Sequence, residues 1–306
     1  MHKFLGKLPA DFADTAVAIG KFDSIHLGHQ QLLHELVHLA DESGLAAAVV
    51  TFDRHPMAVL DPMRVPEQIM GQNQKERMLA SLGIDLLSVL AFDKELATMQ
   101  PEDFVQAHIV PLKARVVVVG EGFRFGVGGS GDVSELSRLG IKYGFQVREI
   151  ANVGANANKI STSEIRKLLQ AGKVEVANLL LGRNHATEGV VEHGRKLGRK
   201  LGYPTANLSR DAEGMLPADG VYAGYLISDG VRYPAAHSIG TNDSIEAVPR
   251  LLESHVIGRD DLDLYDKTVV CEYVAQVRGW AKFDSVEALT DQIALDVKRA
   301  AELLED

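Results

Sequence analysis

The first 182 residues alternate between segments with the pattern of buried strands and segments with the pattern of helices. Ala114–Val119 is apolar throughout after Arg115, which is typical of a central parallel strand covered on both faces. A helix is expected at about Leu27–Asp41, because its apolar side chains recur at helical spacing. Alternating strands and helices form βαβ units, so this half is predicted to be an α/β domain with an open, Rossmann-like parallel sheet. Ligands of such sheets bind beyond the carboxyl ends of the strands.

The pattern changes near residue 183. Short strand-like segments then follow one another between Gly, Asp and Asn residues, without helical periodicity, which favours a small antiparallel β-barrel. A helix is expected to close the chain, with a buried apolar stripe. We therefore predict two domains, residues 1–183 and residues 184–306. The expected barrel strands are Glu188–Glu192, Val221–Ser228, Val231–Ser238, Leu251–Ile257 and Thr268–Val277, and the expected stripe is Val286, Leu289, Ile293 and Val297.

Charge and cysteine content limit the classes of partner. The chain has 42 acidic and 32 basic residues and a net charge of −10, which argues against an obligate binder of nucleic acid or of anionic membranes. Its single cysteine, Cys271, cannot form an internal disulfide and is expected in the core of a strand. No apolar run approaches the ~20 residues that span a bilayer. A cytoplasmic globular protein is expected, and the sequence leaves open whether it forms a homo-oligomer.

The strongest local signal joins the first expected strand to the first expected helix. His26 and His29 lie at positions i and i+3 of an opening helical turn, and Gly28 between them leaves room for a ligand to approach the backbone. Backbone N–H groups and the helix dipole favour phosphate at such a turn, and imidazole donors can neutralise a phosphoryl group in transfer. The alternative, two polar residues at a helix start, is less favoured in this strand–turn–helix context.

A second candidate is a hydroxyl cluster at another helix start. Ser161 and Thr162, with Arg166 one turn later, could hold a polyphosphate through hydroxyl and guanidinium contacts. Ser161 and Glu164 also form a capping box, which explains the same residues without any ligand. In isolation the two interpretations are about equally supported.

The second half contains a basic, glycine-rich loop, residues 194–207, within an otherwise acidic chain. Such a loop suits a nucleoside triphosphate, although a solvated basic loop is the simpler alternative. Thr205 and Asn207 offer neutral oxygens, which suit Mg²⁺ held jointly with substrate phosphates. Glu253 is a lone carboxylate among apolar residues, and partial burial would raise its pKa toward that of a useful general base, whereas a surface-facing glutamate is the simpler reading.

The order of these motifs resembles the prokaryotic bifunctional riboflavin kinase/FAD synthetase family along nearly the whole chain. Each motif is moderately specific, and their order across two domains is highly specific. The motifs are G-K-F-D-S-I-H-L-G-H (20–29), T-F-D-R-H-P (51–56), V-V-G-E-G-F-R-F-G (118–126), I-S-T-S-E-I-R (160–166), L-G-R-K-L-G-Y-P-T-A-N-L (197–208), P-A-D-G-V-Y-A-G (217–224), S-I-G-T-N (238–242) and K-F-D-S-V-E-A-L (282–289).

The resemblance implies two ATP-dependent reactions. Residues 184–306 would phosphorylate riboflavin to FMN, and residues 1–183, a nucleotidyltransferase domain, would adenylylate FMN to FAD with release of pyrophosphate. The implied catalytic residues are His26, His29, Arg166 and Glu253; the implied ATP contacts are Gly20, Phe22, Gly28, Ser161, Thr162, Gly194, Gly198, Lys200 and Gly202; the implied flavin contacts are His55, Phe123, Arg124 and Phe125; and the implied Mg²⁺ ligands are Thr205 and Asn207.

The chain departs from the family pattern at two notable points. Ser24 stands where the family usually has Gly, and Asp243-Ser244-Ile245 stands where it usually reads Pro-Thr-Phe. The second departure neighbours the expected flavin pocket of the kinase. It therefore leaves an alternative open, an FMN adenylyltransferase whose second domain is impaired or non-catalytic. A non-catalytic flavin or nucleotide sensor is a third and less favoured interpretation.

Overall fold

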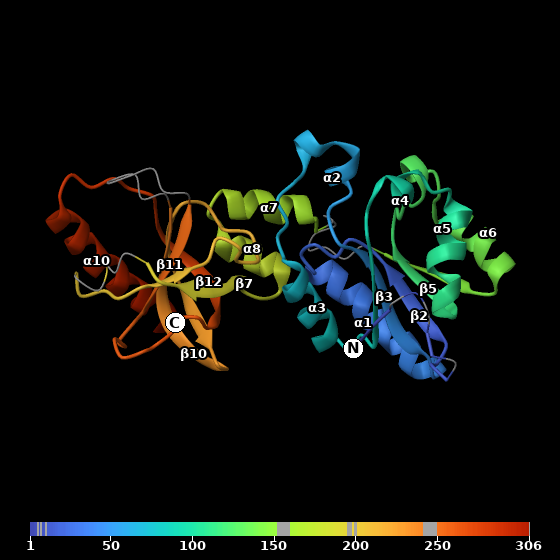
Figure 1. Ribbon diagram of the computed structural model, residues 1–306, viewed down its shortest axis with the longest axis horizontal. Coiled ribbons are helices and arrows are strands. Elements are labelled where there is room, and N and C mark those ends of the chain that lie inside the picture. Colours follow the sequence, from blue (N-terminus) through green and yellow to red (C-terminus); the bar gives the residue numbers. More distant parts are fainter. Residues whose placement is uncertain are drawn as a thin grey trace. The chain divides into compact units, whose positions relative to one another are not determined.

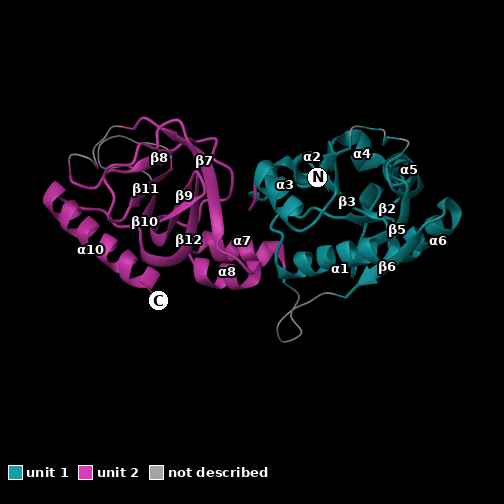
Figure 2. Cartoon of the chain, turned by 90° about the horizontal axis from the view of Figure 1, so that it is seen from below, with its two compact units in different colours: residues 1–68, 72–160 teal, residues 69–71, 161–306 magenta. Residues whose placement is uncertain are grey.

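A computed structural model describes residues 1–4, 6, 8–9, 11–151, 160–194, 198, 201–240 and 250–305. The chain divides into two compact units, shown in Figure 2. Unit 1 contains residues 1–68 and 72–160, and unit 2 contains residues 69–71 and 161–306. The residues of Asp243-Ser244-Ile245 and Lys200 lie outside the described part of the chain.

Unit 1 is built on a parallel sheet of six strands in the order β1-β4-β3-β2-β5-β6. The order runs in opposite directions from β2, so β2 and β5 flank the point where the topology switches, which is where open α/β sheets bind ligands. Every residue of β2 is buried, as the sequence predicted for an inner strand. The strands are β1 (His2–Lys3), β2 (Thr15–Ile19), β3 (Ala46–Phe52), β4 (Leu86–Leu90), β5 (Ala114–Gly120) and β6 (Gln146–Ile150).

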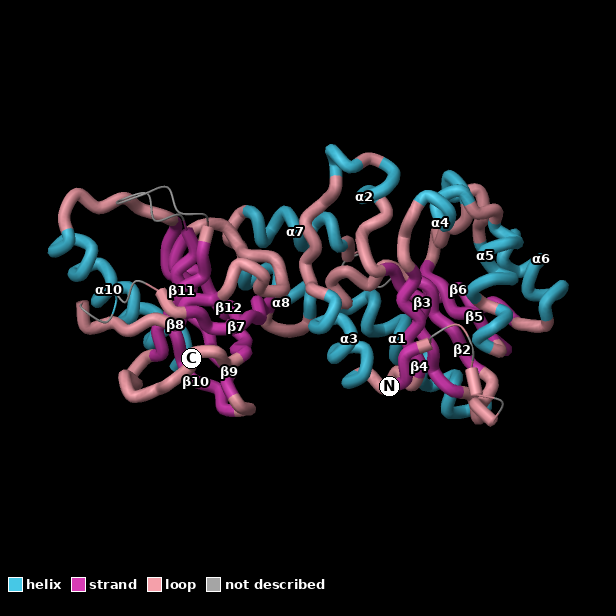
Figure 3. Tube along the Cα trace, viewed as in Figure 1, coloured by secondary structure: helices cyan, strands magenta, loops and turns pink. Residues whose placement is uncertain are grey.

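The helices of unit 1 connect these strands, as Figures 1 and 3 show. Helix α1 packs against β2, β3 and β5. Its buried face, made largely of leucines, follows the predicted apolar spacing. The sequence analysis missed the two-residue strand β1 and the short helices α2 and α4, because segments of this length carry no periodicity. The helices are α1 (Leu27–Ser43), α2 (Met57–Leu60), α3 (Gln72–Ser81), α4 (Lys94–Thr98), α5 (Pro101–His108) and α6 (Val133–Tyr143).

Unit 2 contains a closed antiparallel barrel in the order β10-β11-β8-β7-β12-β9. The predicted barrel is confirmed, with one strand more than expected. Ala206–Leu208, which the sequence suggested was a turn, pairs with both β7 and β11. Cys271 lies in the buried core of the barrel, as expected. The strands are β7 (His185–Glu192), β8 (Ala206–Leu208), β9 (Gly220–Ser228), β10 (Val231–Gly240), β11 (Leu251–Val256) and β12 (Thr268–Gly279).

Within the described residues, the barrel is accompanied by the helices α7 (Thr162–Gln170), α8 (Val174–Leu181) and α10 (Val286–Glu305). The predicted stripe of α10 is wrong at its first position, because Val286 is exposed. The other three positions, Leu289, Ile293 and Val297, are partly buried, and the fully buried positions of this helix are Asp296 and Ala300. Helices α7 and α8 group with the barrel rather than with the parallel sheet. The boundary between the compact units therefore falls between residues 160 and 161 of the chain. The division of activities near residue 183 stays a prediction. None of the helices in the described ranges has the combined length and apolarity needed to cross a bilayer.

Candidate active sites

The turn between β2 and α1 lies at the carboxyl edge of the parallel sheet, at the switch point. Phe22 and Ile25 both adopt positive φ angles, 48° and 41°, and both are buried. Non-glycine residues in this region are strained by about 1–3 kcal/mol and persist only where the surroundings hold them. Ser24 does not adopt a positive φ, so the serine at this position carries no such strain. The turn is therefore a rigid, specifically shaped segment.

The two histidines of this turn are held together. His26 is the N-cap of α1, and its Nδ1 accepts a hydrogen bond from the backbone N–H of His29 at 3.3 Å. The imidazole rings stack at a centroid distance of 3.8 Å and an angle of 12°. Because Nδ1 of His26 is an acceptor, Nε2 of the neutral ring carries the proton and can donate it. The turn thus offers an imidazole donor beside the positive end of a helix.

Gly20 and Phe22 complete the packing around His29. The Phe22 ring meets the His29 ring edge to face at 5.3 Å. A Cβ added at Gly20 would lie 2.9 Å from the Phe22 ring, closer than real side chains pack. Glycine is therefore required at position 20 for the ring of Phe22 to lie against the end of β2.

The predicted flavin contacts of unit 1 lie on two other strand-end loops. His55 follows β3, and its Nδ1 accepts the backbone N–H of Met57 at 3.2 Å. Phe123 and Arg124 follow β5, and Arg124 is exposed with an ion pair of 3.9 Å to Asp132. Phe125 is buried in the hydrophobic core and so anchors this loop to the domain.

Sequence analysis missed one buried charge in unit 1. Lys75 is only 3 % exposed, and its Nζ donates to the carbonyl of Phe52 at 3.4 Å, where β3 ends. Burial lowers the pKa of this lysine, while the nearby carboxylates of Asp23, Asp53 and Glu76 oppose that shift. In the sequence, a lysine among the polar residues of a helix looks like part of a solvent-exposed face. The local pattern therefore gave no signal that this ammonium group is buried near the end of β3.

The predicted phosphate-binding hydroxyls belong to unit 2. Ser161 is the N-cap of α7, and its Oγ accepts the backbone N–H of Glu164 at 3.2 Å. The predicted cap is confirmed. Arg166 is buried, at 9 % exposure.

Three of the predicted kinase residues come together on the barrel. Glu253 on β11 pairs across the strands with Asn207 on β8 and with Ser238 on β10. Thr205 immediately precedes β8. Leu252, Ser254 and Val256 point into the barrel, so Glu253 and its cross-strand partners lie on the outer face.

Glu253 has one property that suits a general base, a raised pKa. Burial raises the pKa of its carboxyl group above the ordinary value. A carboxylate with a raised pKa accepts a proton more readily near neutral pH, which suits proton abstraction from a hydroxyl. In this respect the structure supports the interpretation of Glu253 as more than a surface-facing glutamate.

Glycines shape the loop around Asn207. A Cβ added at Gly194 would lie 2.5 Å from Nδ2 of Asn207, so glycine leaves the space that this amide occupies. A Cβ at Gly198 would collide with the carbonyl oxygen of Tyr203. The backbone N–H of Tyr203 in turn donates to the carbonyl of Gly198 at 2.8 Å. Gly202 adopts a φ of +86°. The oxygens of Thr205 and Asn207 are of the neutral kind that fits Mg²⁺ shared with phosphates.

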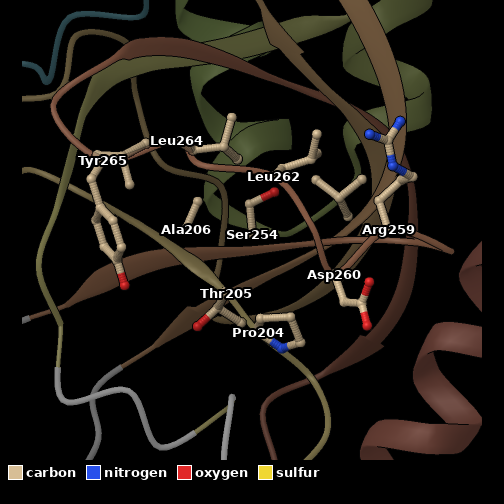
Figure 4. A pocket seen from close by; sticks show the side chains of 11 residues that line it. Pro204, Thr205, Ala206, Ser254, Arg259, Asp260, Leu262, Leu264 and Tyr265 are labelled. Atoms are coloured by element: carbon tan, nitrogen blue, oxygen red, sulfur yellow. The ribbon is translucent and has the colours of Figure 1, made fainter.

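A pocket opens beside Thr205, as Figure 4 shows. Pro204, Thr205, Ala206 and Tyr265 are among the residues that line it. The ring of Tyr265 stacks on that of His193 at 4.0 Å. The lining combines apolar side chains with the hydroxyls of Thr205, Ser254 and Tyr265 and with the charged groups of Arg259 and Asp260.

Two protein-family models match the chain, one in each half. Residues 8–164 match the family model described as FAD synthetase. Residues 181–304 match the family model described as riboflavin kinase. The two models follow one another along the chain and cover the predicted residues of both sites except Arg166, which lies between the matched ranges.

Curated bacterial relatives are similar over almost the whole chain. A bifunctional riboflavin kinase/FMN adenylyltransferase from Bacillus subtilis is 33% identical over 292 residues, covering 94% of this chain and 92% of the relative. The protein of the same name from Escherichia coli K12 is 31% identical and covers 94% of this chain and 91% of the relative. A crystal structure described as a macrolide-efflux protein from Streptococcus pneumoniae has a TM-score of 0.87 and 29% identity, covering 98% of this chain and 99% of that chain.

Proposed function

Because the chain belongs to the family of bifunctional riboflavin kinase/FMN adenylyltransferases, we propose that it makes FAD from riboflavin in two ATP-dependent steps. The barrel phosphorylates riboflavin to FMN, and the parallel-sheet domain transfers AMP from ATP to FMN. The observation that carries this proposal is the match of both family models, in order, to segments that each contain a site of the required chemistry. We keep residues 1–183 and 184–306 as the functional division, because the models end at residue 164 and begin at residue 181.

In the kinase step, Glu253 accepts the proton of the riboflavin 5′-hydroxyl as its oxygen attacks the γ-phosphorus of ATP. The products are FMN and ADP. Thr205 and Asn207 would hold Mg²⁺ together with the ATP phosphates, and the ion would neutralise charge on the transferred group. The loop of Gly194, Gly198, Lys200 and Gly202 would lie along the nucleotide. Positioning and charge neutralisation supply most of the catalysis in phosphoryl transfer.

In the adenylylation step, a phosphate oxygen of FMN attacks the α-phosphorus of ATP, and pyrophosphate leaves. The Nε2–H of His26 and the imidazole of His29 donate to the phosphoryl oxygens as negative charge develops there. Gly20, Phe22 and Gly28 shape the approach of the nucleotide, and His55 with residues 123–125 lines the flavin side. We assign Ser161, Thr162 and Arg166 to the leaving pyrophosphate on the resemblance alone.

A product assay with two single variants tests both assignments in the full chain. With riboflavin, ATP and Mg²⁺, the wild-type chain should form FMN and then FAD, separated by chromatography. His29→Ala should abolish conversion of FMN to FAD and leave FMN formation intact. Glu253→Gln should do the reverse. FAD formation from FMN without any FMN from riboflavin would support the adenylyltransferase-only alternative, and ligand binding without turnover would support a sensor.

A further inference from the structure

The single tryptophan of the chain lies half-exposed beside the kinase site. Trp280 follows β12 directly and is 51% exposed. A Cβ added at Gly240 would lie 3.3 Å from Cδ1 and 3.6 Å from Nε1 of its indole. One edge of the indole therefore rests on a glycine of β10, while much of the ring stays accessible.

The indole and the expected base lie on the same face of the barrel. Gly240 pairs with Leu251, and Ser238 pairs with Glu253, and paired residues point to the same side of a sheet. Gly240 and Ser238 are two residues apart on β10, which separates them by about 7 Å along the strand. The indole, which rests on Gly240, therefore lies about one two-residue strand repeat away from the cross-strand pair of Ser238 and Glu253.

This spacing fits the shape of riboflavin. Its reacting 5′-hydroxyl is joined to the aromatic isoalloxazine by a chain of carbon atoms, whose extended length is about 6 Å at ~1.5 Å per bond. A molecule with its hydroxyl at Glu253 can therefore bring its ring system to the indole. Flat aromatic systems stack favourably on tryptophan, and glycine at position 240 leaves the ring lying close to the sheet.

The backbone that carries Trp280 is firmly held. Arg278, two residues earlier, donates through Nε and NH2 to the carboxylate of Asp296 on α10, at 2.9 Å and 2.8 Å. The guanidinium also lies 5.4 Å from the ring of Phe283. A ring platform mounted on a fixed backbone loses little freedom when a ligand stacks on it.

We infer that Trp280 is a flavin-stacking residue of the kinase site and sets its affinity for the isoalloxazine. The inference rests on the proposed kinase activity. It concerns a residue that the sequence motifs did not mark, and it assigns to this side chain the recognition of the ring rather than of the reacting hydroxyl.

Steady-state kinetics of the full chain test this role. Trp280→Ala should raise KM for riboflavin on the order of tenfold, because stacking is lost, and leave KM for ATP and the rate of FMN adenylylation unchanged. Trp280→Phe keeps an aromatic platform and should recover most of the affinity. Val231→Ala is the matched control, since Val231 is an exposed apolar residue at the opposite end of β10 and should leave all constants unchanged.

A second measurement needs no variant. The chain has one tryptophan, so riboflavin should quench its fluorescence saturably, with a midpoint that matches KM for riboflavin. An unchanged riboflavin KM in Trp280→Ala, an equal rise in KM for ATP, or unquenched emission at saturating riboflavin would each overturn the stacking role. If the wild-type chain forms no FMN at all, the proposed kinase fails as well. Normal FMN formation with an unchanged riboflavin KM in Trp280→Ala overturns only the present inference.

Discussion

At the scale of single residues, the turn proposed as the adenylylation site requires glycine at position 20. Phe22 is 1% exposed and adopts a positive φ, so its ring cannot move away easily. The ring lies 2.9 Å from where a Cβ of residue 20 would be, and it meets the His29 ring in a T-shaped contact. The geometry of the histidine pair therefore depends on glycine at position 20.

Gly20→Ala should destabilise unit 1 by about 1–3 kcal/mol, because an added methyl group in a packed site forces the neighbouring ring to shift. We expect FMN adenylylation to fall at least about tenfold, as ~1.4 kcal/mol corresponds to a factor of ten, while riboflavin phosphorylation is unchanged. Urea unfolding and the two product assays measure these effects. Gly120→Ala is the stability control, because its Cβ would meet only Leu32 at an ordinary 3.6 Å. Equal stability losses in the two variants would contradict the argument.

Residue-level prediction from the sequence succeeded where a motif has a local physical meaning. The histidines at i and i+3 do form one face of a helix start, and Ser161 does cap its helix. Lys75 and Trp280 were missed, because their importance comes from contacts with Phe52 and Gly240, which lie far away in the sequence. Such tertiary burial and exposure leave no trace in local spacing.

At the scale of elements, the barrel interior contains two histidines that stay neutral. Burial lowers the pKa of both His185 and His237 to about 4. His237 hydrogen-bonds Ser254 at 3.0 Å and the carbonyl of Glu272 at 3.1 Å. Nε2 of His185 contacts the carbonyl of Met215 at 2.6 Å. Both rings are therefore held as neutral, hydrogen-bonded groups inside the folded barrel.

The stability of the barrel should therefore fall as the pH falls from about 7 to 4. In the unfolded chain these histidines bind protons near pH 6.5, but in the folded barrel only near pH 4, so acid favours unfolding. Each contributes a loss of up to about 3 kcal/mol, at ~1.4 kcal/mol per pH unit. Urea unfolding followed by Trp280 fluorescence at several pH values measures the slope. His237→Gln should reduce it, and His38→Gln, at an exposed site, should not. A slope that His237→Gln leaves unchanged would refute this origin.

Helix α10 is attached to the barrel by a buried charge pair in addition to the apolar side chains of its inner face, of which Val297 packs against the barrel. Asp296 is 5% exposed and accepts hydrogen bonds from Arg278 and from Gln292. Small residues, Ala223, Ala236 and Ala300, allow the helix to lie close to the strands. The periodicity of apolar residues therefore identified the helix and most of the face that packs on the barrel, but not the charge pair within that face.

Asp296→Ala should lower the free energy of unfolding of the barrel by about 2–4 kcal/mol, since it leaves the half-buried guanidinium of Arg278 without its partner. Glu302→Ala on the same helix removes a pair with Arg299 that is exposed on both sides, and should cost less than about 1 kcal/mol. Denaturant unfolding of both variants provides the comparison. Similar losses in the two would show that burial of the first pair is unimportant.

At the scale of the whole molecule, fold class and domain order could be predicted from the sequence, because alternating and evenly spaced apolar segments are properties of long stretches. The extent of each compact unit could not. Helices α7 and α8 have the same amphipathic pattern as the helices of the parallel sheet, yet Asn178 of α8 donates to the carbonyl of Tyr273 in β12 at 2.8 Å. Only contacts between residues about a hundred positions apart show that these helices belong with the barrel and not with the parallel sheet.

These contacts predict how the barrel behaves as a fragment. The side chain of Asn178 also accepts the N–H of His185 at 2.7 Å, and Glu175 accepts the N–H of Gln276 at 2.9 Å. Val174, Ala177 and Leu181 are fully buried in the same helix. Burial of one large aliphatic side chain contributes about 1.5–3 kcal/mol, so losing this helix removes much of a typical stability of about 5–15 kcal/mol.

A fragment of residues 161–306 should therefore fold and phosphorylate riboflavin, whereas a fragment of residues 184–306 should be largely unfolded. Circular dichroism, Trp280 emission and FMN formation compare them directly. Within the full chain, Asn178→Ala should destabilise the barrel by about 1–3 kcal/mol, because it leaves the buried backbone groups of Tyr273 and His185 without partners. Val176→Ala is the control, since Val176 is an exposed residue of the same helix and should change stability little. If the shorter fragment is as stable as the longer one, α7 and α8 are dispensable to the barrel, and the division of the chain belongs near residue 183 after all.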